Sequence, residues 1–202
     1  FDVVLPRGIP YKGQVLNQLA AFWFEQTRAI APNHVLEVPD PNVMVVAECR
    51  QLPIELIVRG YITGVTKTSL WYNYERGVRR YCGHVLPEGL KKDQALARPI
   101  LTPTTKLEAH DRPIAREEAI AERLVTPELF DAAAAICFQL YDFGVRHARQ
   151  QGLILVDTKY ELGLLDGQVT VSDEIHTPDS SRYWFADTYA ENRATGAFIV
   201  ID

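Results

Sequence analysis

LILVDTKYELGLL, residues 153–165, runs into Asp166 and Gly167 and then into QVTVSDEI, residues 168–175. Both stretches are rich in apolar and β-branched side chains, which favour strands. An Asp-Gly pair between two such stretches is a strong signal for a tight hairpin. The sequence therefore predicts two adjacent antiparallel strands here, and the rest of the chain is interpreted around them.

Three ionisable side chains alternate along the first predicted strand: Asp157, Lys159 and Glu161. Because successive side chains of a strand point to opposite faces, these three share one face, with about 6.6 Å between neighbours. An acid, a base and an acid then line one wall, which makes this face a candidate site for chemistry. The alternative is a solvated strand face whose charges form ion pairs.

The length of the hairpin turn decides where Asp173 lies. With a two-residue turn, Asp173 pairs with Tyr160 and faces away from Glu161. With a three-residue bulged turn over residues 165–167, Asp173 lies opposite Lys159. Its carboxylate then converges with that of Glu161. We expect the three-residue turn, because two carboxylates beside a cation provide the oxygen ligands that suit Mg²⁺.

The remaining elements mix helices and strands without the strict alternation of a parallel sheet. Apolar residues recur at three- and four-residue steps over residues 13–31, which predicts an amphipathic helix. Thr126 before Pro127 is a helix-start signal, and this helix is expected to run to about Gln151 before Gly152. This pattern favours an α+β fold. Strands are expected over residues 1–10, 43–49 and 53–64, and little regular structure over residues 77–113.

Two arginines are candidates for holding an anion. Arg59 follows an apolar strand, where burying a guanidinium costs free energy unless it meets an anion. That anion is either Glu55 or a carboxylate or phosphate of a ligand. Asp179 and Arg182 have the spacing of a helix start, at which Asp179 caps the helix and Arg182 holds an anion. Ordinary helix capping is the alternative.

Lys106, His110 and Asp111 form a polar cluster on a predicted loop. A polar group on a loop is a stronger indication of function than one on a helix face, although a surface histidine is the alternative. The sequence contains no P-loop, zincin, nucleophile-elbow or dinucleotide-binding motif. Hydrolase and dehydrogenase classes that depend on those motifs therefore have no support.

Composition narrows the class of protein further. With 202 residues, 47% of them hydrophobic, the chain is long enough to bury a sizeable core. Its net charge of −5 provides no basic field for nucleic acid or anionic lipid. The sequence has no run of about 20 apolar residues and does not begin like a signal peptide. We expect a soluble cytoplasmic protein whose three distant cysteines stay reduced, and nothing in the sequence indicates an oligomeric state.

Four stretches in this order resemble the SAICAR synthetase family, the phosphoribosylaminoimidazole-succinocarboxamide synthases of purine biosynthesis. They are LPIELIVRGYITG, TPTTK with the HD that follows it, VDTKYELG and SDEIHTPDSSRYW. The resemblance implies a two-lobed α+β fold related to the nucleotide-binding lobes of protein kinases and ATP-grasp enzymes. Residues 1–50 would be the remainder of an amino-terminal sheet lobe, residues 51–202 the larger catalytic α+β lobe, and the cleft between them the ATP site.

The resemblance also implies a carbon–nitrogen ligase that uses ATP, Mg²⁺, L-aspartate and carboxyaminoimidazole ribotide, with no nucleic acid or membrane partner. Glu161 and Asp173 are implied as the Mg²⁺ ligands, and Lys159 as the cation beside the transferred phosphoryl group. The implied binding residues are Arg59, Ser69 and Arg182 for the ribotide phosphate and carboxylate, Glu55 and Asp179 for its imidazole, Glu48 to Gln51 for adenine, and Lys106, His110 and Asp111 for the aspartate site.

Two departures from the family pattern affect these expectations. Val65 stands where many relatives have serine after ITG, so the serine role is placed on Ser69, which precedes Leu70 and Trp71. The family's glycine-rich strand and loop over the ATP phosphates would precede Phe1 and are not in this sequence. A catalytically silent module that binds nucleotide or ribotide is therefore the alternative function.

Overall fold

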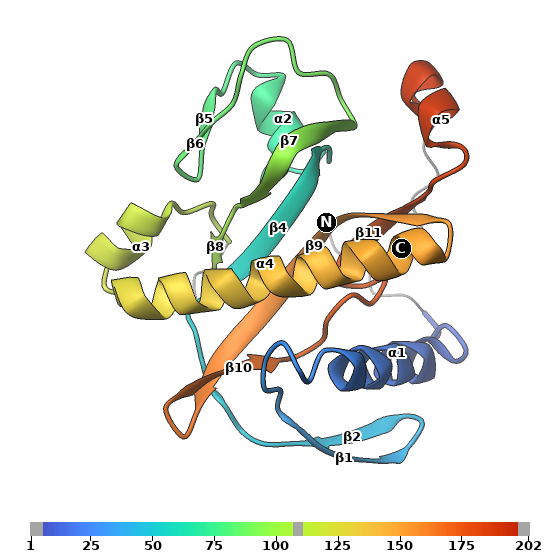
Figure 1. Ribbon diagram of the computed structural model, residues 1–202, viewed down its shortest axis with the longest axis vertical. Coiled ribbons are helices and arrows are strands. Elements are labelled where there is room, and N and C mark those ends of the chain that lie inside the picture. Colours follow the sequence, from blue (N-terminus) through green and yellow to red (C-terminus); the bar gives the residue numbers. More distant parts are fainter. Residues whose placement is uncertain (1–5, 107–110, 198–202) are drawn as a thin grey trace.

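The computed structural model describes residues 6–106 and 111–197 of the chain. Figure 1 shows a central sheet with the long helix α4 across one face and smaller elements at both ends. The helices are α1 (Lys12–Gln26), α2 (Leu70–Tyr74), α3 (Arg116–Ala121), α4 (Pro127–Gln150) and α5 (Tyr189–Thr195). The strands are β1 (Val35–Asp40), β2 (Val43–Val46), β3 (Arg50–Gln51), β4 (Ile54–Ile62), β5 (Arg80–Tyr81), β6 (His84–Val85), β7 (Gln94–Leu101), β8 (Thr104–Thr105), β9 (Leu153–Leu165), β10 (Gln168–Ser172) and β11 (Ser181–Phe185).

The central sheet has the strand order β10-β9-β4-β7, with β11 and β3 also paired to β9 and β8 paired to β4. The pairings between these named strands are antiparallel, which confirms the α+β prediction. Strand β9 spans 13 residues. Strands β4 and β11 flank its first half, and β10 and β3 flank its second half. Strand β9, which carries Asp157, Lys159 and Glu161, is therefore the centre of the sheet.

Helix α4 covers one face of this sheet (Figure 1). The side-chain oxygen of Thr126 accepts a hydrogen bond from the Leu129 N–H at 3.2 Å, and Pro127 occupies the first helical turn. Gly152 follows the helix with φ 73°, a left-handed conformation that glycine adopts at little cost. The predicted start and end of this helix are confirmed. Its buried side chains include Phe130, Ala133, Cys137, Leu140 and Tyr141.

The amino-terminal part of the described chain packs at the end of the sheet where strand β10 lies. Helix α1 lies beside the β1–β2 hairpin, at the bottom of Figure 1. The hairpin joins the sheet through the backbone of His34, whose N–H donates to the Val171 carbonyl at 3.1 Å. Of the predicted strand over residues 1–10, residues 1–5 lie outside the described residues and residues 6–10 form bends and a turn. The strand predicted over residues 43–49 ends at Val46.

The prediction of little regular structure over residues 77–113 is wrong. Strand β7 pairs with β4, and the short strands β5 and β6 form a hairpin above it. Pro99 and several exposed side chains in β7 conceal the strand, because proline and polar residues are typical of strands at a sheet edge. This region has its own small core, made by Ile62, Leu70, Tyr74, Tyr81, Leu86 and Ile100.

Candidate active site

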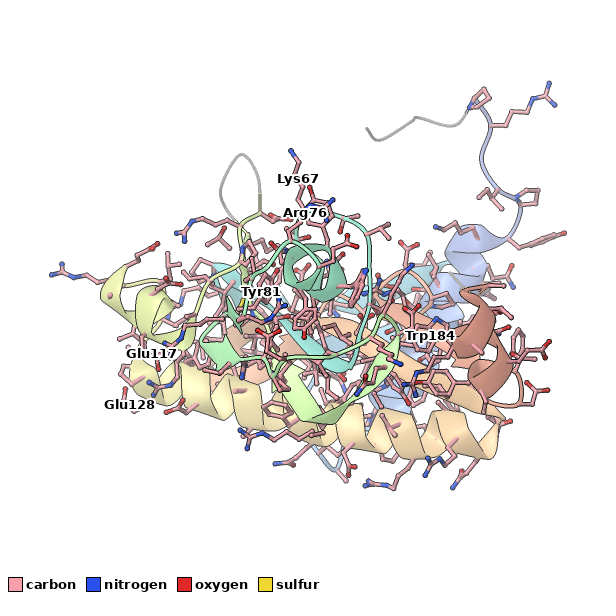
Figure 2. All side chains as sticks on the ribbon, turned by 90° about the horizontal axis from the view of Figure 1, so that it is seen from above. Lys67, Arg76, Tyr81, Glu117, Glu128 and Trp184 are labelled. Atoms are coloured by element: carbon pink, nitrogen blue, oxygen red, sulfur yellow. The ribbon has the colours of Figure 1, made fainter. Side chains whose placement is uncertain are left out.

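A cavity of about 690 Å³ opens over the centre of the sheet. Strands β4, β9 and β11 form its floor, and two loops, residues 63–69 and 178–180, form parts of its wall. Trp184, labelled in Figure 2, lines it from β11. Lys67 lies on the first loop but points outward into solvent in Figure 2, so it does not line the cavity.

A row of three charged side chains crosses the sheet at one end of the cavity. Asp157 on β9 lies opposite Arg59 on β4 and opposite Arg182 on β11. The Nε of Arg182 donates to Asp157 Oδ1 at 2.8 Å, and its Nη2 donates to Oδ2. Arg59 Nη1 lies 3.5 Å from Asp157 Oδ2. One carboxylate therefore holds two guanidinium groups side by side, which leaves this end of the cavity with a net positive charge.

Arg59 is buried and fixed by neutral groups as well. Its Nε donates to Thr102 Oγ1 at 2.7 Å and its Nη2 donates to the Thr68 carbonyl at 3.2 Å. The same carbonyl accepts a hydrogen bond from the Tyr81 hydroxyl at 2.7 Å. Burial lowers the pKa of Arg59 and Asp157 opposes this, but a guanidinium stays charged at neutral pH. The expectation that Glu55 could be its partner is wrong, because Asp157 takes that place.

Ser69 lies in the wall of the cavity beside these arginines. Its Oγ accepts a hydrogen bond from the Thr66 N–H at 3.2 Å and lies 2.7 Å from Thr66 Oγ1. Gly64, with φ 91°, packs against it so closely that a Cβ there would lie 2.4 Å from Ser69 Oγ. The same Cβ would lie 2.9 Å from Arg182 Nη1. The loop can therefore bring Ser69 next to Arg182 only because residue 64 has no side chain.

The opposite end of the row on β9 carries interleaved lysines and glutamates. Lys159 Nζ donates to Glu55 Oε1 at 3.1 Å and to Glu161 Oε1 at 3.2 Å. Lys106 forms an ion pair with Glu161 and lies 3.6 Å from Glu55. Burial lowers the pKa of Lys159, but the two carboxylates outweigh burial and raise it above its usual value. Burial raises the pKa of Glu161, and the two lysines outweigh that effect, so this pKa is lowered.

Asp173 reaches this cluster by a route that the sequence did not indicate. The hairpin turn has two residues, Asp166 and Gly167, because Gln168 pairs with Leu165. The prediction of a three-residue turn is therefore wrong. Strand β10 ends at Ser172, and Asp173 then adopts a left-handed φ of 61° instead of continuing the strand.

The consequence is that the carboxylates of Asp173 and Glu161 converge, although the turn is the shorter one. Burial raises the pKa of Asp173, and the negative charge of Glu161 raises it further, against the opposing effect of Lys159 and Lys106. Two converging carboxylates of this kind can share a divalent cation with phosphate oxygens. Within residues 6–106 and 111–197, no group of three or more His, Cys, Asp or Glu side chains forms a metal site of its own.

The structure places the other predicted residues around the same cavity. Asp179 lines it, but the segment that follows is strand β11, so the predicted helix start is wrong. Its carboxylate pairs with Lys12 Nζ of α1 at 2.7 Å. Asp111 lines the cavity and is exposed, whereas His110 lies outside the described residues. The roles of these side chains stay predictions.

The segment from Glu48 to Gln51 ends in strand β3, whose two residues, Arg50 and Gln51, pair with the second half of β9. A Cβ on Gly163 would lie 3.1 Å from the Arg50 carbonyl oxygen, so glycine is needed for this close approach. The Ser172 hydroxyl donates to Gln51 Oε1 at 2.9 Å, which places Gln51 next to the residue that precedes Asp173. The predicted adenine-binding segment and the predicted metal ligand are therefore neighbours.

Sequence reasoning missed the role of three residues in this cavity. Asp157 was placed on the correct face without a partner, because its pairing depends on the registers of β4 and β11. Gly64 carries a usable signal, since a glycine in a loop after an apolar strand indicates a positive φ or a close approach. Asp93 also lines the cavity and is buried, and nothing in its local sequence indicates this.

The fold and the cavity define an α+β protein with a charged cavity over an antiparallel sheet. The sequence model of the SAICAR synthetase family matches residues 1–197, and the chain belongs to that family. The resemblance noted from the four sequence stretches is confirmed.

Curated relatives agree with this assignment. The phosphoribosylaminoimidazole-succinocarboxamide synthase of Legionella pneumophila (strain Paris) is 51% identical over 189 residues, which cover 93% of this chain and 61% of that protein. The chloroplastic enzyme of Vigna aconitifolia is 47% identical over 197 residues, covering 97% of this chain and 58% of that protein. The chain thus spans about three fifths of the length of the curated relatives it matches.

Solved structures share the fold. A SAICAR synthase from Saccharomyces cerevisiae, in complex with SAICAR, superposes with a TM-score of 0.81 at 29% identity, covering 100% of this chain and 69% of that one. A SAICAR synthetase in complex with ADP superposes with a TM-score of 0.75 at 22% identity, covering 96% of this chain and 84% of that one. None of the helices in the described part of this chain is long and apolar enough to cross a membrane.

Proposed function

We propose that this chain catalyses the ATP-dependent joining of L-aspartate to carboxyaminoimidazole ribotide, which forms SAICAR in purine biosynthesis. The observation that carries the proposal is a cavity lined by Arg59 and Arg182 at one end and by Glu55 and Lys159 at the other, in a chain of the SAICAR synthetase family. Lys159 connects the second end to Glu161, which lies next to the cavity. An arginine pair suits a phosphate at one end, and a cluster of lysines and carboxylates suits phosphoryl transfer at the other. The yeast relative in complex with SAICAR supports the choice of product.

The reaction explains why the cavity carries so much charge. A carboxylate is a poor acylating agent, because its oxyanion is a poor leaving group. Transfer of the ATP γ-phosphoryl group to the ribotide carboxylate gives an acyl phosphate, and the amine of aspartate then attacks its carbonyl carbon and releases phosphate. Three anionic reactants must meet, and two like charges about 4 Å apart repel by about 4 kcal/mol at an effective dielectric near 20. Positive side chains must offset this repulsion.

Arg59, Arg182 and Ser69 bind the phosphate and carboxylate groups of the ribotide in this proposal. Both guanidinium groups already face the cavity, and Asp157 holds them in place before any ligand arrives. Binding to such a fixed site costs little ordering of side chains. Glu55 and Asp179 line the same cavity and are assigned to the imidazole part of the ribotide.

Glu161 and Asp173 hold Mg²⁺ in this proposal, and Lys159 stabilises the negative charge of the transferred phosphoryl group. The residues fit a hard cation, because the negative charge of Glu161 raises the pKa of Asp173, as expected for two neighbouring carboxylates. Glu161 and Asp173 would hold magnesium, which would supply positive charge to offset the negative charge of the ATP phosphates. Lys106, which pairs with Glu161, and Asp111 are assigned to the aspartate side of the site, together with His110.

The remaining assignments concern the nucleotide and the setting of the enzyme. Adenine is assigned to the segment from Glu48 to Gln51, at the boundary between a lobe of residues 1–50 and a larger lobe of residues 51–202. The ADP complex of a protein with the same fold supports a nucleotide site in this fold. We expect small-molecule partners only, and a cytoplasmic location, although one plant relative is named as chloroplastic.

The test is a turnover assay on the purified chain with ATP, Mg²⁺, L-aspartate and carboxyaminoimidazole ribotide. ADP, phosphate and SAICAR should form in equal amounts, and omission of any one substrate should stop SAICAR formation. ADP formation without aspartate or ribotide would instead indicate a phosphotransferase with another acceptor. Ribotide binding without any Mg²⁺-dependent ATP binding would favour the silent binding module and contradict the proposal.

A further inference from the structure

Asp93 is a buried carboxylate that none of the roles above explains. It lies directly before strand β7, is 4% exposed and lines the same cavity as Arg59, Ser69 and Arg182. An ionised carboxylate loses its hydration when it is buried, so it needs hydrogen-bond donors to replace water. A buried acid with few donors in a ligand-sized cavity is therefore a candidate for binding a ligand.

The side chain of Asp93 uses only part of its capacity to accept hydrogen bonds. Thr63 Oγ1 donates to Asp93 Oδ1 at 2.5 Å. Among the residues that the structure describes, this is the single hydrogen bond to the carboxylate. A carboxylate has about four acceptor positions on its two oxygens. The unused positions can accept a donor from a molecule in the cavity.

The backbone of Asp93 is held in a conformation that an aspartate rarely adopts. Its φ is 62°, in the left-handed region. The Asp93 N–H donates to the Ile62 carbonyl at 2.7 Å, and the Tyr189 hydroxyl donates to the Asp93 carbonyl at 2.8 Å. These two hydrogen bonds, from different elements, fix the direction of the side chain before a ligand binds.

Through its hydrogen bond with Thr63, Asp93 is connected to the end of the cavity that contains the two arginines. Thr63 precedes Gly64, and Gly64 is the residue packed against Ser69 Oγ and Arg182 Nη1. A sugar phosphate that binds there through its phosphate keeps its ring hydroxyls within a few bonds of that phosphate. A carboxylate accepts hydrogen bonds from hydroxyl groups and repels a second phosphate. Asp93 therefore suits the sugar part of a monophosphate.

We propose that Asp93 accepts a hydrogen bond from a ring hydroxyl of the bound ribosyl phosphate, so that the cavity distinguishes ribosyl from deoxyribosyl phosphates. This inference rests on the proposed function, because it takes the ribotide phosphate to lie at Arg59, Ser69 and Arg182. It adds a specificity-determining residue on the sugar side of the cavity.

The test is calorimetric binding of methyl β-D-ribofuranoside 5-phosphate and of its 2-deoxy and 3-deoxy counterparts to the whole chain. The methyl group fixes the furanose ring, so that the ligands differ by one hydroxyl. Wild-type protein should bind the ribosyl ligand about tenfold more tightly than one of the deoxy ligands, as expected for a hydrogen bond to a charged group. In Asp93→Gly, which tolerates the left-handed φ, this ratio should fall to about one.

Asp93→Asn is the matched control, because asparagine tolerates a left-handed φ and keeps an oxygen for Thr63. Asp93→Asn should fold like the wild type. It should keep only part of the preference for the ribosyl ligand, because one carboxylate oxygen is replaced by an amide nitrogen, which donates hydrogen bonds instead of accepting them. Inorganic phosphate should bind all three proteins equally. Equal ratios in wild type and Asp93→Gly, with phosphate binding retained, would overturn the inference alone. Absence of phosphate binding in the wild type would overturn the proposed function as well.

Discussion

The two ends of the cavity share strand β9 but are built in opposite ways. At the arginine end, Asp157 and Arg59 are 5% and 6% exposed, and one carboxylate holds two guanidinium groups within a fixed set of hydrogen bonds. At the carboxylate end, Asp173 is exposed and repelled by Glu161, and the lysines beside them are only partly buried. The buried carboxylate at the arginine end is therefore paired before a ligand binds, whereas repulsion between the carboxylates remains at the other end.

Under the proposed function, this difference between the two ends indicates which reactant binds at each of them. A buried, paired arginine row can hold the ribotide in one position throughout a reaction. At the other end, Lys106 and Lys159 offset only part of the repulsion between Asp173 and Glu161, so a divalent cation would relieve the rest and that end can change as nucleotide and metal bind and leave. A fixed site at one end and exchange at the other are consistent with the proposed ligase reaction, which has two successive chemical steps.

Removal of the central carboxylate at the arginine end should have the largest effect on stability. Asp157→Ala leaves the buried guanidinium of Arg59 and the partly buried one of Arg182 without their shared counter-charge, and breaking a buried pair in this way typically costs about 3 to 5 kcal/mol. The free energy of unfolding in urea measures the loss. Asp142→Ala is the control, because Asp142 forms an exposed pair with Arg146 and should change stability by less than about 0.5 kcal/mol. Equal losses in both variants would contradict the buried charge row.

Substitution of Asp173 should separate turnover from stability. Asp173→Asn removes a proposed metal ligand and should lower turnover at least about a hundredfold. Because the folded state raises the pKa of this acid, ionisation opposes folding at neutral pH, and the neutral amide should therefore raise stability slightly, by at most about 1 kcal/mol after solvent screening.

Asp166→Asn is the matched control for Asp173→Asn, because Asp166 is also exposed and left-handed, with φ 51°, on the same hairpin. It should leave both turnover and stability unchanged. Turnover at the wild-type rate in Asp173→Asn would refute the metal assignment.

A methyl group at Gly64 should weaken binding of the ribotide. Gly64→Ala would push Ser69 and Arg182 apart, and we expect about a tenfold loss of ribotide affinity by calorimetry. Gly77→Ala separates this effect from backbone strain. Its φ is 90°, close to that of Gly64, but a Cβ there meets no atom within 4 Å. Gly77→Ala should lose about 1 to 2 kcal/mol of stability from the left-handed backbone alone. Gly64→Ala should lose more, because its Cβ also overlaps Ser69, and only Gly64→Ala should lose affinity. Equal affinities would contradict the close packing of this loop.

Acid should loosen the segment that joins the two ends, residues 173–182. His176 is buried within it, its Nε2 lies 2.6 Å from the Tyr160 hydroxyl, and burial lowers its pKa to about 3. The unfolded chain therefore takes up a proton near pH 6.5 that the folded chain does not, so stability falls as the pH drops below this value.

Between pH 6 and pH 5 the loss from His176 should be about 1 kcal/mol, measured by urea unfolding at each pH. His176→Gln should be less stable at neutral pH but should lack this share of the pH slope. An unchanged slope in the variant would show that the imidazole is not held in its neutral form. His34, whose pKa burial also lowers, contributes a slope of the same sign in both proteins.

Local sequence patterns were sufficient to predict helix α4 and the face of β9 on which the charged side chains lie. The alternation of Asp157, Lys159 and Glu161 placed them correctly on one face of β9, and Thr126 with Pro127 marked the start of α4. These features depend on a few consecutive residues. Strand β7 was missed because an edge strand tolerates the polar residues and the proline that normally indicate a loop.

The geometry of the site depended on contacts between distant segments. An Asp-Gly pair is compatible with either hairpin turn, and the convergence of Asp173 with Glu161 comes from the left-handed φ at residue 173. The backbone before it is held by residues far away in the sequence, since the Val171 N–H donates to the Pro32 carbonyl at 2.9 Å. Asp157 likewise acquires its role only from the pairing of three strands.

The most direct test of two separate ends is a calorimetric comparison of two ligands on two variants. Arg182→Met should lose most of its ribotide affinity and retain Mg²⁺-dependent ATP binding. Asp173→Asn should retain ribotide affinity and lose the Mg²⁺ dependence of ATP binding. Loss of both ligands in either variant, or of the same ligand in both, would contradict the division of the cavity into a fixed anion site and an adjustable metal site.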